Sequence, residues 1–183
     1  MTSVLPAQRT QFSAAYGPWF PSGDSTAQVF SAGIHQPLGA FFGLGLGLVH
    51  VADERSSAQR TLTGGELTLR VGGQDRGLYG IAASGIGFRH HDGNPDAFWS
   101  VGAGFAFRLF SAVVLGVEGR YRVEDTGLGG FWRLDPSDRK GFLVQARLSF
   151  RIPGLGAAGA AQPAARPGRP ETENLPPPGE PYD

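Results

Sequence analysis

The sequence has no cysteine, no net charge and no long apolar run. The absence of cysteine excludes disulfides and thiolate chemistry. Sixteen Lys and Arg residues balance sixteen Asp and Glu residues, so composition gives no electrostatic reason to expect nucleic-acid binding. Glycines interrupt the most apolar stretch, residues 41–51, and no run approaches the roughly 18 residues that a membrane-spanning helix needs.

Glycine and aromatic residues are abundant instead. The chain has 29 glycines in 183 residues, 11% aromatic residues and 17% charged residues, whereas average proteins have roughly 7% glycine and about 25% charged residues. This composition favours closely packed strands over helices. Residues 152–183 are rich in Pro, Ala and Gly and predict a disordered tail.

Residues 1–10 form a separate N-terminal segment. Residues 1–8 have neither the charged region nor the apolar region of about 7–15 residues that a secretory signal requires. Two interpretations stay open. The segment is either the remnant of a signal region or the start of a cytosolic protein.

Eight segments between residues 11 and 151 alternate between apolar and polar or small residues, which is typical of strands with two unlike faces. Most of them are longer than the 5 or 6 residues common in soluble strands, and they suit the roughly 9–11 residues of a tilted membrane strand. The predicted strands are 11–19, 27–36, 40–51, 60–71, 78–90, 97–109, 112–124 and 141–151.

The connections between these strands alternate in length. Those at 37–39, 72–77 and 110–111 are short, whereas the four others are longer and polar. Short turns at one end and long loops at the other are typical of bacterial outer-membrane barrels. The sequence therefore predicts an all-β fold, an eight-stranded antiparallel up-and-down transmembrane β-barrel over residues 11–151. It has no dinucleotide, Walker or zinc motif, so we expect no cofactor.

One face of the strands is apolar, and the other combines glycine with charged residues. In a soluble barrel the apolar face would point inward, and alternation alone does not separate the two cases. Glycine weakens a strand that faces water, but it makes room inside a narrow barrel filled by side chains. We therefore expect a buried ion-pair network in the lumen. Its predicted members are Glu66, Arg70, Arg108, Glu118, Arg120, Arg122 and Arg147.

Aromatic residues collect near both ends of the predicted strands. Two such bands are typical of the interfacial girdles of membrane barrels, although strands favour aromatic residues in any setting. In segment 78–90 the apolar phase shifts, which predicts a bulge near residues 83–84. The predicted girdle contains Tyr16, Trp19, Trp99, Tyr121, Tyr79 and Phe107.

The last predicted strand reads Gly-Phe-Leu-Val-Gln-Ala-Arg-Leu-Ser-Phe over residues 141–150. With it, residues 11–151 resemble the eight-stranded outer-membrane β-barrel superfamily, which includes the transmembrane domain of outer-membrane protein A and small adhesin-like barrels. The strand looks like the C-terminal assembly signal of that family, carried here by Phe142, Val144, Leu148 and Phe150. In the family this Phe is often the last residue, whereas here Arg151 and a Pro-rich tail follow.

The resemblance implies insertion by the outer-membrane assembly machinery and a location in the bacterial outer membrane. The expected partners are outer-membrane lipid and lipopolysaccharide, and the expected state is a monomer. The tail, residues 152–183, is similar to the Ala/Pro linker that joins such barrels to a periplasmic peptidoglycan-binding domain, and the resemblance implies that it is a periplasmic tail.

Few residues suggest chemistry. His90, His91, Asp92 and Asp96 form a cluster that could hold a metal, but polar loop residues explain it better, and we expect no metal site. Some related barrels are lipid-modifying hydrolases or acyltransferases. Here only His90, Ser100 and Glu124 offer the residue types for that chemistry, and nothing fixes their spacing, so we expect no enzyme.

The long loop between the last two strands contains Phe131 and Trp132. An exposed aromatic pair of this kind is suited to binding a partner, or else to lying at the level of the lipid headgroups. Our first hypothesis is a non-enzymatic outer-membrane protein with a closed lumen and a structural or surface-recognition role.

The second hypothesis is a soluble barrel that binds a small apolar ligand. It requires the apolar face to turn inward. The residues that would then line the interior are Phe42, Leu44, Phe105 and Val117.

Overall fold

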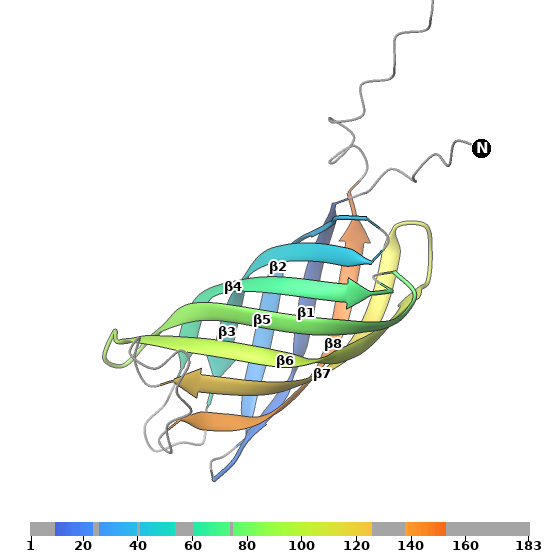
Figure 1. The fold of residues 1–183 in the computed structure, drawn as a ribbon. Coiled ribbons are helices and arrows are strands. Elements are labelled where there is room, and N and C mark those ends of the chain that lie inside the picture. The colour runs from blue at the N-terminus through green and yellow to red at the C-terminus, as the bar shows by residue number, and fades with distance from the viewer. Residues whose placement is uncertain are drawn as a thin grey trace, which may run out of the picture.

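The computed structural model is a closed barrel of eight antiparallel strands (Figure 1). This confirms the predicted fold class, and the strand ends lie within two residues of the predicted ones. The structure describes residues 10–23, 26–39, 41–53, 61–73, 75–125 and 138–152. The tail beyond Ile152 and the segment before Thr10 lie outside these ranges. The strands are β1 (Gln11–Pro21), β2 (Ala27–Pro37), β3 (Phe42–Ala52), β4 (Leu62–Gly72), β5 (Gly77–Arg89), β6 (Pro95–Arg108), β7 (Val113–Asp125) and β8 (Arg139–Arg151).

Each strand pairs with its neighbours in sequence, and β1 closes the barrel by pairing with β8. The seam runs from Gln11 opposite Arg151 to Pro21 opposite Gly141. It continues one step further, because the Ile152 N–H donates to the Thr10 carbonyl at 2.9 Å. Closure leaves no strand with an unpaired edge, which is how up-and-down barrels avoid edge-to-edge association.

The connections separate the barrel into two unlike rims. Residues 38–41, 73–76 and 109–112 form the short-turn rim, where β1 begins and β8 ends. Residues 22–26, 53–61, 90–94 and 126–138 connect strands at the opposite, long-loop rim. In the described part of the chain, no helix is long and apolar enough to cross a membrane.

Side chains alternate strictly between the lumen and the outside. On β8, for example, Gln145 and Arg147 are buried, whereas Val144 and Leu148 are exposed. Large apolar side chains are exposed on every strand, and we call this surface the outer apolar belt. Its members include Phe12, Tyr16, Phe30, Ile34, Phe42, Leu44, Leu46, Leu48, Leu67, Leu69, Leu78, Phe88, Val101, Phe105, Val117, Phe142, Val144 and Phe150.

Inward-facing glycines make room for large side chains on the neighbouring strands. A Cβ at Gly104 on β6 would overlap the ring of Tyr79, and one at Gly85 on β5 would overlap the ring of Phe98. These two rings fit in the lumen because glycine stands opposite them. At other strand glycines, such as Gly102 and Gly141, a Cβ would instead overlap the backbone of the neighbouring strand, so the close approach of the strands also requires glycine.

We expect Gly104→Ala to lower the free energy of unfolding by about 1–3 kcal/mol, the usual cost of overpacking. The added methyl group would displace Tyr79 from its buried position. Chemical denaturation followed by tryptophan fluorescence measures the effect. Gly119→Ala is the matched control, because Gly119 faces outward on β7 with nothing within 4 Å of its missing Cβ. Equal stabilities of the two variants would contradict the prediction.

The phase of β5 differs from the sequence prediction. The strand pairs with β4 and β6 without interruption, so the predicted bulge at residues 83–84 was wrong. Both faces of β5 carry apolar residues, and local alternation therefore had no contrast from which to read its phase. Tyr79, Ile81 and Ala83 point inward, whereas Leu78, Ile86 and Phe88 point outward.

Candidate functional site: the charged lumen

Charged and polar side chains from four strands meet in the middle of the lumen. We call this group the central lumen cluster, and all its members are buried. They sit there because alternate positions of a strand share one face, as residues 66 and 70 do on β4 and residues 118 and 120 on β7. The cluster contains Glu66, Arg70, Tyr79, Glu118, Arg120 and Arg147.

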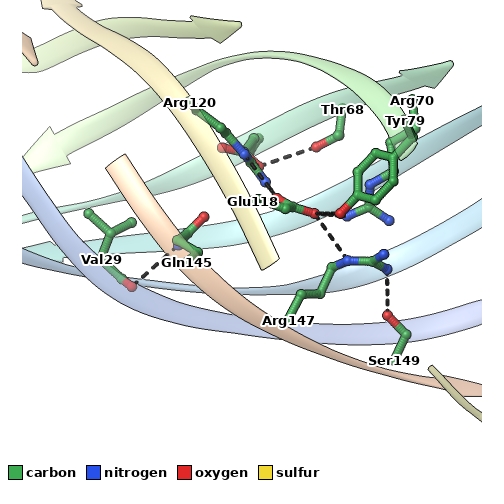
Figure 2. A network of polar contacts seen from close by, with 10 residues as sticks. Val29, Thr68, Arg70, Tyr79, Glu118, Arg120, Gln145, Arg147 and Ser149 are labelled. Carbon is green, nitrogen blue, oxygen red and sulfur yellow. Dashed lines mark hydrogen bonds and ion pairs between the residues drawn. The ribbon is translucent and has the colours of Figure 1, made fainter. Parts of the chain in front are cut away.

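Glu118 is the hub of this cluster (Figure 2). Its Oε1 accepts a hydrogen bond from the Tyr79 hydroxyl at 2.7 Å and lies 3.4 Å from Arg70 Nη2 and 3.0 Å from Arg147 Nε. Its Oε2 accepts a hydrogen bond from Arg120 Nε at 3.0 Å and a second from Arg120 Nη2. A fully buried carboxylate is tolerated only with such partners.

The remaining contacts of the cluster involve Glu66 and Arg147. Glu66 accepts a hydrogen bond from Arg120 Nη1 at 3.4 Å and one from the Thr68 hydroxyl at 3.2 Å. Arg147 Nη1 donates to the Ser149 hydroxyl at 2.6 Å. The cluster therefore cross-links β4, β5, β7 and β8 through the interior.

A second group of charges lies toward the long-loop rim. Arg122 Nη2 lies 3.0 Å from Glu124 Oε1, and Arg139 Nη2 lies 2.8 Å from Asp53 Oδ2. Arg122 also lies over the Phe98 ring, with its Cζ 4.1 Å from the centroid. Arg122 thus faces the lumen, but none of its ion pairs within the described residues joins it to Glu118.

Trp19 is part of this second group and not of the outer girdle. Its side chain is 0% exposed, and Arg139 lies over it with a Cζ-to-centroid distance of 4.7 Å. The girdle assignment of Trp19 was therefore wrong. Trp19 and Phe20 are adjacent aromatic residues, so only one can face outward. Trp19 faces inward, where it lies in one buried apolar cluster with Leu143 and beneath Arg139.

The short-turn rim is tied together by Asp75 from the β4–β5 turn. Its Oδ1 accepts a hydrogen bond from Gln11 Nε2 at 2.7 Å, and its Oδ2 accepts one from Arg108 Nη2 at 3.0 Å and one from Arg151. Gln11 and Arg151 lie opposite each other across the β1–β8 seam. Asp75 therefore braces the seam from the inside of the rim.

Arg108 consequently lies outside the network in which the sequence analysis placed it. It is the last residue of β6 and is exposed at the rim, where it pairs with Asp75 instead of Glu118. Strand alternation gave its direction correctly, but it did not show that the lumen had already ended at that height.

We expect Asp75→Asn to lower the free energy of unfolding by about 1 kcal/mol, since its partners are partly exposed and such ion pairs contribute little. The loss should shrink in high salt, because screening already weakens the exposed pair in the parent protein. Denaturation at low and high salt measures both effects. Arg76→Gln, in the same turn and exposed, is the control and should have little effect.

The other predicted girdle residues face outward, whereas Tyr79 does not. Trp99, Tyr121 and Phe142 form an aromatic row, with centroid distances of 6.5 Å and 5.6 Å between successive rings. Tyr79 is buried against Glu118, so its assignment to the girdle was wrong. Tyr16 and Phe107 are exposed on the belt, as are the four residues of the predicted assembly signal, Phe142, Val144, Leu148 and Phe150.

The residue types considered for catalysis do not come together. His90 is exposed and shares a hydrogen bond of 2.9 Å with the Thr63 hydroxyl, whereas Ser100 is buried in the lumen and Glu124 is paired with Arg122. Phe131 and Trp132 lie outside the described residues, so their predicted role in recognition stays a prediction.

The His/Asp cluster considered for a metal is also divided. Asp92 and Asp96 both pair with Arg89, at 3.1 Å and 3.0 Å. The Asn94 backbone N–H donates to Asp92 at 3.1 Å and lowers the pKa of that exposed carboxyl. Within the described ranges, no group of three His, Cys, Asp or Glu residues is placed to hold a metal ion.

Three charged residues were missed by the sequence analysis, namely Asp53 and Arg139 in the second lumen group and Asp75 at the short-turn rim. Asp53 and Asp75 lie just beyond strand ends, where alternation no longer indicates direction. Arg139 begins β8, which was predicted to start two residues later. One signal in the sequence could have indicated these residues. Arg108 and Arg122 were predicted to face inward, and a buried arginine requires an acidic partner.

Comparison with known proteins gives no family assignment. No protein-family model and no curated protein matches the chain. Among solved structures, a chain from the structure described as De novo design of transmembrane beta-barrels is 16% identical with a TM-score of 0.46, over 80% of this chain and 97% of its own length. The N-terminal β-barrel domain of Pseudomonas aeruginosa OprF is 12% identical with a TM-score of 0.47, over 79% of this chain and 99% of its own.

Both TM-scores are below 0.5, so the assignment of the fold does not rest on these likenesses. The fold follows from the chain's own strand pairing, which is continuous from β1 to β8 and back. The chain is an eight-stranded, closed, up-and-down antiparallel β-barrel, similar in fold to the OprF barrel domain and to designed transmembrane barrels.

Proposed function

We propose that this chain is a non-enzymatic integral protein of the bacterial outer membrane, with a closed lumen and a structural or surface-recognition role. The observation that carries the proposal is the outer apolar belt. A protein in water rarely exposes contiguous apolar patches larger than a few hundred Å², whereas here apolar side chains surround a closed barrel.

The height of the belt suits a bilayer. The exposed apolar residues run from Val101 on β6 to Leu109, the residue just after this strand, which is eight residue steps. At about 3.4 Å per residue and a tilt of about 40°, this run spans roughly 21 Å, close to the apolar band of about 25 Å in outer-membrane barrels.

The directions of the apolar side chains argue against the alternative of a soluble, ligand-binding barrel. It needs four apolar side chains to point inward, and all four point outward on the belt, each more than 40% exposed: Phe42, Leu44, Phe105 and Val117. The middle of the interior instead contains arginine, glutamate and tyrosine. Apolar side chains that do point inward, such as Trp19, Val49 and Phe98, pack together in a buried cluster.

The ion pairs in the middle of the lumen, between the two rims, favour a structural or recognition role over transport. The ion pairs of the central lumen cluster cross the middle of the barrel, which supports a closed lumen, and we place a surface partner at the long-loop rim. Outer-membrane lipid and lipopolysaccharide are the expected surroundings of the belt, and the assembly machinery is the expected partner of β8. We propose that the protein is a monomer.

Purification with and without detergent tests the proposal. We expect the folded chain to require detergent or lipid and to migrate differently on a gel before and after boiling, because a closed barrel resists unfolding by the gel detergent. A monomer that stays dispersed in plain buffer, with one mobility, would contradict membrane placement. In a planar bilayer we expect no large, stable conductance, and its presence would contradict the closed lumen.

A further inference from the structure

The central lumen cluster contains more positive than negative charge. Its three guanidinium groups belong to Arg70, Arg120 and Arg147, and its two carboxylates belong to Glu66 and Glu118. Arginine stays protonated in proteins, and both carboxylates are paired with it. Within the described residues of the cluster, one positive charge therefore has no negative counterpart. An uncompensated charge in a buried site is costly.

The excess charge is localised on two neighbouring arginines. Arg70 and Arg147 both reach Glu118 Oε1, so one carboxylate oxygen serves two guanidinium groups, which lie close together in Figure 2. Among the described residues, Arg70 Nε and Nη1 and Arg147 Nη2 have no hydrogen-bond partner, although all three atoms are buried. These N–H groups can therefore donate hydrogen bonds to a further, negatively charged partner.

A cavity lies beside these two arginines. Its volume is about 30 Å³, which is room for about two water-sized spheres. Gly33 on β2 and Gly45 and Gly47 on β3 form part of its wall. The polar residues that line it include Ser13, Ser31, Thr68, Arg70, Arg120 and Arg147.

We propose that this cavity is a binding site for one monovalent anion of halide size, held between Arg70 and Arg147. Such an anion balances the single excess charge and fits the volume. Sulfate and phosphate fit less well, because each brings four oxygens and up to two or three charges. Glu66 also lines the cavity, but its carboxylate is already engaged by Arg120 and Thr68.

The site depends on the closed lumen and not on the medium around the barrel. A failure of the outer-membrane proposal would therefore leave it standing, and its own failure would leave the membrane proposal standing. The bound anion would stabilise the folded barrel, and its removal would leave the excess positive charge of the cluster without a counterion.

Crystals of the unaltered full chain, grown in detergent with bromide as the halide, give the direct test. We expect an anomalous bromide peak in the cavity, within hydrogen-bond distance of Arg70 and Arg147. Density there that is explained by water alone, with bromide only on the outer surface, would overturn the proposal.

Unfolding rates in sodium bromide and in sodium gluconate at equal ionic strength give an independent test. We expect unfolding to be several-fold slower in bromide, with a saturable dependence on its concentration. Arg70→Gln balances the cluster at two charges of each sign and should abolish the difference. Thr68→Glu places a carboxylate in the cavity and should also abolish it.

Arg108→Gln is the matched control, since Arg108 lies at the rim and does not line the cavity. It should retain the full halide response. An equal response in the parent protein and all three variants would indicate screening of surface charges and would overturn the proposal.

Discussion

Glu118→Gln is expected to lower the free energy of unfolding by about 3–5 kcal/mol, the cost of removing one partner from a buried ion pair. The substitution preserves the shape of the side chain but removes the charge that holds three arginines. Each of those arginines then remains buried with less compensation, and the amide presents N–H groups to other N–H donors. Equilibrium denaturation in lipid vesicles, followed by tryptophan fluorescence, measures the loss.

Glu66→Gln is the matched control for this experiment. Glu66 is also buried, but within the described cluster its ion pair is with Arg120 alone, so its loss should be clearly smaller. In the double variant Glu118→Gln/Arg147→Gln, part of the penalty should be recovered, because contacting residues are not additive. A Glu118→Gln protein within 1 kcal/mol of the parent would show that the cluster does not stabilise the barrel.

Leu46→Arg should lower the free energy of unfolding from a bilayer by about 2–4 kcal/mol, as lipid-facing arginines near the membrane midplane do. Leu46 lies in the middle of β3 and is 70% exposed on the outer apolar belt. In water the same exposed position would tolerate arginine with a change of about 0.5 kcal/mol or less. The size of the loss in free energy of unfolding therefore distinguishes a belt that faces lipid from one that faces water.

Leu109→Arg provides the comparison at the edge of the belt. Leu109 is also exposed, but it lies in the β6–β7 turn at the short-turn rim, where the cost should be about 0–1 kcal/mol. Titration with urea in vesicles of one lipid composition compares both variants with the parent. Equal, small effects at residues 46 and 109 would indicate that the belt does not face lipid.

Much of the architecture could be predicted from the sequence, because a strand that separates two environments has a period of two residues along its whole length. Strands such as β7 and β8, with charge on one face and apolar residues on the other, gave both position and phase. Where both faces are apolar, as on β5, the pattern located the strand but not its phase. There the register with β4 and β6, which is a non-local property, decides that Tyr79 points inward.

The polar interior was less accessible from the sequence than the fold. Alternation indicates that Arg70, Arg122 and Arg147 face inward, but not which acidic residue each one meets. Those pairings depend on the stagger between strands that are far apart in sequence, such as the 48 residues that separate Arg70 from Glu118. Residues beyond the strand ends, such as Asp75, follow no period, so their contacts are properties of the assembled barrel.

The pairing of β1 with β8 has a consequence for how the chain can be rearranged. Thr10 and Ile152 are hydrogen-bonded neighbours, so a short linker could join them, and new ends could be opened between β3 and β4. Strand neighbours in such a circular permutant would be unchanged, but β8 would become an internal strand and β3 the terminal one. The permutant would separate what the sequence of β8 contributes to assembly from what its place at the end of the barrel contributes.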